Sequence, residues 1–122
     1  MTKTLYFDKV YGMSNNKTTI WKNDVAQQLA EALLCIDNTK DMQNFLRDVM
    51  TEKEILEISS RLEAARMLQA GNKYIDIVAI TKLSSRTVAR ISNWLQNGCN
   101  GYQIVLKTIS THHNHIPPVR AE

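Results

Sequence analysis

Two arginines and an asparagine recur at helical spacing in the second half of this chain of 122 residues, and their side chains are suited to reading base edges. Arg86, Arg90 and Asn93 are four and three residues apart, so they share one face of a helix predicted over 85–96. Ala89 lies on the same face, which carries no acidic residue. In the major groove of DNA, arginine pairs with guanine and asparagine with adenine. We therefore expect this face to contact DNA bases.

The opposite face of the predicted helix requires a partner helix to cover it. Val88, Ile91 and Leu95 are three and four residues apart and form an apolar stripe. A shorter helix, predicted over 73–80, precedes it and supplies the covering surface. Two helices that cross steeply need a small residue where they touch, and we assign that role to Ala79. The pattern predicts a helix-turn-helix.

The turn between the two helices is predicted over 81–83. Ser84 is a suitable N-cap for the second helix. We expect Ser84, Ser85 and Lys73 to contact the DNA backbone. Lys82 occupies a position at which such turns commonly have glycine with a positive φ, so lysine predicts either backbone strain or a different turn.

Three amphipathic helices are predicted ahead of this motif. The first two begin at 23–24 and 38–39, where asparagine, aspartate or threonine can act as an N-cap. Thr51 and Glu54 have the spacing of a capping box, which begins the third helix. That helix ends at Ala70, with Gly71 as a left-handed cap. The predicted fold class is all-α, a multi-helix core followed by a helix-turn-helix.

Charge is distributed unevenly between the two predicted parts. Residues 23–60 contain three Lys and Arg against eight Asp and Glu, whereas residues 61–107 contain seven against two. The net charge of the whole chain is only +3. A basic part beside an acidic part favours a polyanionic partner for the basic one, although a solvated surface can show the same asymmetry.

Other functional classes find little support in the sequence. The serines of the motif have no histidine near them in the sequence, and no glycine-rich phosphate loop is present, so we expect no enzyme and no cofactor. Cys35 and Cys99 have no metal-ligand spacing and are expected to be reduced and partly buried. Tyr74 and Trp94 are expected in the core rather than stacked on bases. Three histidines near the C-terminus are expected in a flexible tail rather than at a metal site: His112, His113 and His115.

Membrane insertion and secretion are also not expected. No apolar run approaches the length of about 18 residues that a membrane-spanning helix needs. Asp8 interrupts the N-terminus before the apolar region of a signal peptide could form. We expect a cytoplasmic protein that associates with the nucleoid when it binds DNA.

The chain from 42 to about 109 resembles the trp repressor superfamily. Three features carry the resemblance: 45–54 (FLRDVMTEKE), 61–68 (RLEAARML), and 87–98 (TVARISNWLQNG) followed by 101–106 (GYQIVL). The last segment is similar to the trp-repressor-like (YerC/YecD-like) branch rather than to trp repressor itself. The resemblance implies an all-α, intertwined homodimer that binds double-stranded DNA and acts as a transcriptional regulator, a repressor.

Trp repressor also binds tryptophan as a corepressor, and the resemblance places Thr51, Arg61 and Arg90 at the positions of its ligand pocket. Ile91 stands where trp repressor has glycine, and Trp94 where it has serine. Both replacements add bulk where the indole ring would lie and disfavour tryptophan. Arg61 can instead pair with an acid, and Arg90 can contact DNA.

Because residues before 22 and after 110 show no core pattern, we expect a flexible N-terminal arm (1–21) and a flexible tail (111–122). Between them lie a helical core (22–70), to which the resemblance assigns dimerisation, and the helix-turn-helix with the segment after it (71–110). Two alternatives to a simple DNA-binding repressor stay open. One is a protein-interaction module that uses the helix-turn-helix as a scaffold. The other is a tryptophan-responsive repressor. The operator and target genes do not follow from the sequence.

Overall fold

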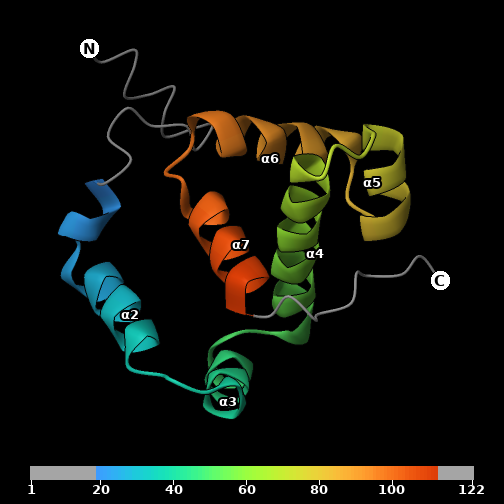
Figure 1. Ribbon diagram of the computed structural model, residues 1–122. Coiled ribbons are helices and arrows are strands. Elements are labelled where there is room, and N and C mark those ends of the chain that lie inside the picture. The colour runs from blue at the N-terminus through green and yellow to red at the C-terminus, as the bar shows by residue number, and fades with distance from the viewer. Residues whose placement is uncertain (1–18, 113–122) are drawn as a thin grey trace. The chain divides into compact units, whose positions relative to one another are not determined.

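The computed structural model describes residues 19–112, which form two compact units with their boundary between Thr51 and Glu52. Within these residues every regular element is helical, as predicted (Figure 1). The first unit contains a short 3₁₀ helix and two α-helices. The second contains four α-helices and includes the helix-turn-helix.

The first unit comprises η1 (Thr19–Lys22), α2 (Asp24–Leu34) and α3 (Thr39–Val49). The side chain of Asn23 accepts a hydrogen bond from the amide of Ala26 at 2.9 Å. The side chain of Asn38 accepts one from the amide of Asp41 at 2.8 Å. These two caps confirm the predicted starts of α2 and α3, because each satisfies an amide that has no partner within its own helix.

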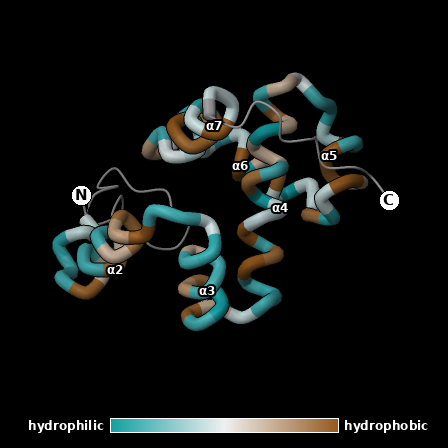
Figure 2. The backbone as a smooth tube through the Cα atoms, turned by 60° about the horizontal axis from the view of Figure 1, so that its bottom comes forward, coloured by the Kyte–Doolittle hydropathy of each residue, from teal (hydrophilic) through white to brown (hydrophobic). Residues whose placement is uncertain are grey.

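No residue of the first unit's three helices is buried in the protomer. Val25 on α2 is 74% exposed, and Leu34 at the end of α2 is 86% exposed. Figure 2 shows hydrophobic segments along α2, and large apolar side chains on this helix are exposed. The unit therefore presents amphipathic helices without a closed core of its own. Residues 19–21, expected to belong to a flexible arm over 1–21, are part of η1. Residues 1–18 lie outside the described part.

The second unit comprises α4 (Glu52–Gln69), α5 (Tyr74–Thr81), α6 (Ser85–Asn97) and α7 (Gly101–His112). Figure 1 shows α6 lying across one end of α4, with α5 and α7 to either side of α4 in that view. The buried core lies where these helices meet and consists of Ala64, Ala65, Met67, Ile77, Val88, Ile91, Leu95 and Leu106.

The second half of α4 belongs to the same core as the helix-turn-helix. Ala64 and Ala65 are fully buried, so α5 and α6 can approach the α4 backbone closely. The two compact units divide at the start of α4, whereas the functional boundary expected between 70 and 71 stays a prediction. The local reading of α4 is confirmed: it begins directly after Thr51, and Gly71 adopts a φ of +86° at its end.

The α7 helix was not predicted as a helix. It begins after Asn100, which has a φ of +66°, and the Nε2 of Gln103 donates to the carbonyl oxygen of Leu95 at 2.6 Å. The helix continues through Thr111 and His112, two residues into the segment expected to be a flexible tail. The rest of that tail, including His113 and His115, lies outside the described residues.

Candidate nucleic-acid interface

Three fully buried side chains hold the two helices of the motif together: Ile77 from α5, and Val88 and Ile91 from α6. Leu95, at 8% exposure, continues the buried stripe toward the end of α6. These residues confirm the stripe predicted for α6. The α6 helix is thus supported along most of its length, because a close-packed interface leaves it little freedom to tilt.

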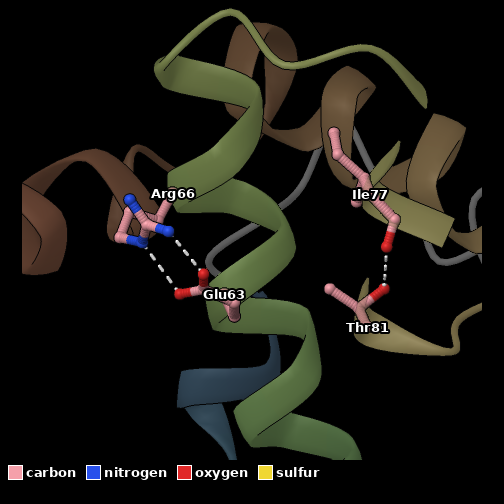
Figure 3. Close-up of polar contacts among 4 residues, drawn as sticks. All are labelled: Glu63, Arg66, Ile77 and Thr81. Atoms are coloured by element: carbon pink, nitrogen blue, oxygen red, sulfur yellow. Dashed lines mark hydrogen bonds and ion pairs between the residues drawn. The ribbon is translucent and has the colours of Figure 1, made fainter. Parts of the chain in front are cut away.

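The turn is fixed by the hydroxyl of Thr81, which is only 9% exposed. This hydroxyl donates to the carbonyl oxygen of Ile77 at 2.7 Å and accepts from the amide of Leu83 at 3.3 Å (Figure 3 shows the first bond). One buried hydroxyl therefore joins the last turn of α5 to the chain that enters α6. This role of Thr81 was not foreseen.

Lys82 ends α5 in the left-handed conformation, with φ 63° and ψ 12°, and its amide donates to the carbonyl oxygen of Val78 at 2.9 Å. Of the two outcomes predicted for lysine here, the structure has the first: the turn is kept and the backbone is strained.

The N-terminus of α6 is capped as predicted. The hydroxyl of Ser84 accepts from the amide of Thr87 at 3.1 Å, while its own proton is within reach of the Thr87 hydroxyl oxygen at 3.1 Å. The Ser84 backbone is extended, at φ −69° and ψ 156°, so the chain turns sharply into the helix. The first turn of α6 is thereby ordered at the end that carries Ser85 and Arg86.

The outer face of α6 is arranged as the spacing predicted. Ser85, Arg86, Ala89 and Arg90 are exposed. The last three lie on the side opposite the buried stripe, and Ser85 lies on the flank of that side. Asn93 is half-buried, and its Oδ1 accepts from the Nδ2 of Asn97 at 2.9 Å. The structure thus brings all five predicted residues of α6 to one surface, with Asn93 the least accessible. Their contact with DNA stays a prediction.

Lys73 lies at the start of α5, where it occupies the N-cap position without a capping bond from its side chain. It is exposed, as the prediction of a backbone contact requires. Ser84 is also exposed, but its hydroxyl is used in the cap of α6.

Two ion pairs lie within α4. Glu63 receives two hydrogen bonds from Arg66, one of them from Nε at 2.8 Å (Figure 3). The bond to Glu63 is the main reason that the pKa of Arg66 is raised above its ordinary value. Arg61 pairs with Glu57 at 3.3 Å. Within residues 19–112 no ion pair involves Arg86 or Arg90, so no acidic side chain of the described residues neutralises their charges.

The three residues predicted for a ligand pocket differ in their burial and in the compact unit to which they belong. Arg61 is half-buried on α4, and its Nε is buried without a hydrogen-bond partner. Burial raises the pKa of Tyr102 on α7, and the positive charge of Arg61 opposes that rise. Arg90 is exposed on α6 and Thr51 belongs to the first unit. That these three residues form a ligand site stays a prediction.

The two bulky residues at this site belong to the protein's own packing. Ile91 is fully buried in the core, and Trp94 is half-buried and packs against it. Both side chains therefore occupy space inside the second unit.

Several other expectations require correction. Ala79 is exposed, and the small residues at the helix crossing are Ala64 and Ala65 of α4. The adjacent alanines in the sequence of α4 were the signal from which a close approach of other helices could have been predicted. Tyr74 is 43% exposed and does not join the core. Both cysteines, Cys35 and Cys99, are exposed rather than partly buried.

The described residues offer neither a membrane-spanning helix nor a cluster of metal ligands. None of the helices within 19–112 combines the length and the apolar character needed to cross a membrane. In the same range no group of three or more His, Cys, Asp or Glu side chains is placed to hold a metal ion.

Comparisons of the sequence and of the structure with known proteins point to one family. The model of a family described as Trp repressor protein matches residues 24–110. An uncharacterised protein, YerC of Bacillus subtilis (strain 168), is 33% identical over 82 residues, which are 67% of this chain and 79% of YerC. The crystal structure of a TrpR-like protein from Eubacterium eligens superposes with a TM-score of 0.70 at 33% identity, covering 75% of this chain and 94% of that one. A putative Trp repressor from Staphylococcus aureus gives 0.68 at 25% identity, covering 82% and 92%.

Proposed function

This chain belongs to the Trp repressor family, and from that premise we propose that it is a sequence-specific DNA-binding regulator of transcription, a repressor that acts as a homodimer in the cytoplasm. The observation that carries the proposal is the outer face of α6. Arg86 and Arg90 are exposed there without an acidic partner among the described residues, on a helix that buried side chains fix in place.

The chemistry of that face suits the major groove. A guanidinium group offers a planar pair of donors that matches the acceptors on guanine, and the amide of Asn93 can match adenine. Ala89 adds a small apolar contact that a thymine methyl group can meet. Lys73 and Ser85 stand at the starts of α5 and α6, where backbone amides and positive helix ends favour phosphate.

The exposed apolar side chains support a homodimer. Besides those of the first unit, Ile58 on α4 is 53% exposed and Ile104 on α7 is 63% exposed. Large apolar side chains left uncovered in this number are unusual for a monomer and favour a partner surface. A two-fold dimer would present its two recognition helices about 34 Å apart, one helical turn of DNA.

The test is a selection of bound sequences from random duplex DNA by the purified full chain, repeated at two salt concentrations, with the mass in solution measured alongside. We expect a dimer, an enriched inverted repeat, and binding that weakens as salt rises, because phosphate contacts release counterions. Salt-sensitive retention without an enriched motif would replace the proposal with a non-specific DNA-coating protein. No retention by a folded dimer, with or without tryptophan, would favour a protein-interaction module.

A further inference from the structure

Within residues 19–112 only two non-glycine residues have a positive φ, and one of them is Lys82 in the turn of the helix-turn-helix. The other is Asn100, between α6 and α7. Asparagine is enriched in the left-handed region because its short side chain is tolerated there, whereas lysine has no such advantage. Lys82 therefore requires an explanation that Asn100 does not.

The conformation itself is dictated by the turn. The amide of Lys82 is bonded to Val78 at 2.9 Å, and the buried hydroxyl of Thr81 holds the amide of Leu83 at 3.3 Å. Since both neighbours of Lys82 are tied in place, its φ has little freedom. Glycine would adopt the same φ without strain.

Among the described residues, the side chain of Lys82 has no ion pair and no place in the core that would compensate for the strain. It is exposed and lies outside the core and the residues packed against it. Neither of the ion pairs found among the described residues includes it. Neither the backbone geometry nor the packing and ion pairs of the described residues explain why lysine stands at this position. Strained residues of this kind are concentrated at functional sites.

We infer that Lys82 is a phosphate-binding residue of the DNA interface, whose ammonium group contacts the backbone beside the groove that α6 enters. This inference rests on the proposed function. Only Leu83 separates Lys82 from Ser84, the cap of α6, so the positive charge of Lys82 lies close in sequence to the end of α6 that carries Ser85 and Arg86. A lysine contacting phosphate carries no sequence information, so Lys82 should strengthen binding to all duplexes equally.

The experiment compares Lys82→Gly and Lys82→Gln with the wild-type chain. Dissociation constants are measured over a range of salt on the selected duplex and on a scrambled one, and the melting temperature of each variant is recorded without DNA. Lys40→Gln removes one charge from α3 in the first unit, and Asn100→Gly relaxes the other positive φ. These two variants control for net charge and for backbone relaxation.

We expect Lys82→Gly to melt at or above the wild-type temperature and yet to bind both duplexes roughly eightfold more weakly near 0.1 M salt, because each phosphate contact contributes about 0.9 to the logarithmic salt slope. The slope itself should fall by about one for both Lys82 variants. Neither control should change the slope.

An unchanged slope and affinity for Lys82→Gly, in a wild-type protein that binds DNA, would overturn the assignment of Lys82 and leave the proposed function intact. A wild-type chain that binds no duplex would overturn both. A loss for Lys82→Gly that Lys40→Gln reproduces would assign the effect to net charge and would also reject the contact.

Discussion

The hydroxyl of Ser84 accepts a hydrogen bond from the amide of Thr87 at 3.1 Å, and this bond orders the first turn of the helix that presents Arg86. Replacing Ser84 with alanine removes the acceptor and leaves that amide without its cap. We expect Ser84→Ala to lower the free energy of unfolding by about 1 kcal/mol, the usual loss at an N-cap. Urea unfolding followed by circular dichroism measures it.

Ser84→Asp separates the cap from the DNA surface. Aspartate is an equally good N-cap, and its charge suits the positive end of a helix, so stability should be kept. The same charge would stand beside DNA phosphates and should weaken binding. An alanine variant as stable as the wild type would show that the bond does not stabilise α6.

Arg86→Ala tests base reading on the exposed face of α6. If Arg86 pairs with a guanine, its loss should raise the free energy of binding to the selected duplex by about 1–3 kcal/mol and relax the preference at one base pair. Fluorescence anisotropy with single-base variants of the duplex measures both effects. Arg47→Ala, on α3 of the first unit, is the control and should leave the preference unchanged. An unaltered affinity for the Arg86 variant would remove this residue from the base-reading set.

Local signals explain which elements were predictable. Asn23, Asn38 and Ser84 cap their helices through neighbours three residues away, so the starts of α2, α3 and α6 are encoded within a few positions. The buried stripe of α6 was readable for the same reason, because helical spacing determines which residues share a face. Once the buried stripe was assigned, the remaining residues of α6 had to form its outer face, which is the candidate site.

Features that depend on distant residues were not predictable. The side chain of Gln103 ties α7 to the carbonyl oxygen of Leu95, eight residues earlier, a bond between two helices that spacing within one helix does not reveal. Ala79 was expected at the helix crossing, but the contact is made by α4, which the local pattern of α5 and α6 cannot reveal. For Lys82 the sequence predicted either strain or a different turn. Which of the two occurs depends on the buried hydroxyl of Thr81, which holds the turn in place.

Gly98→Ala is expected to destabilise the end of α6. A Cβ atom on Gly98 would lie 2.4 Å from the carbonyl oxygen of Trp94, which is too close for any real contact. The chain must shift, and we expect a loss of about 1–3 kcal/mol in the free energy of unfolding, as for other overpacked sites. Thermal melting measures the loss.

Gly101→Ala is the matched control for this substitution. Nothing lies within 4 Å of a Cβ atom built at Gly101, which begins α7. Alanine is favoured over glycine in helices by up to about 1 kcal/mol, so this variant should be neutral or slightly more stable. Equal melting temperatures for the two alanine variants would show that the backbone at Gly98 adjusts freely.

Tryptophan is expected to leave DNA binding unchanged. Ile91 is fully buried and Trp94 packs against the same core, so the orientation of α6 is set by the chain's own side chains. A corepressor acts by binding one orientation more tightly than another, and typical couplings change affinity by about 5–150-fold. Because α6 is already held against α4 and α5, few other orientations of α6 are available for a ligand to select. Titration of the selected duplex with the protein, with and without millimolar tryptophan, should give equal dissociation constants. An increase in affinity of fivefold or more would instead show that Arg61 and Arg90 serve a ligand pocket despite the bulk of Ile91 and Trp94.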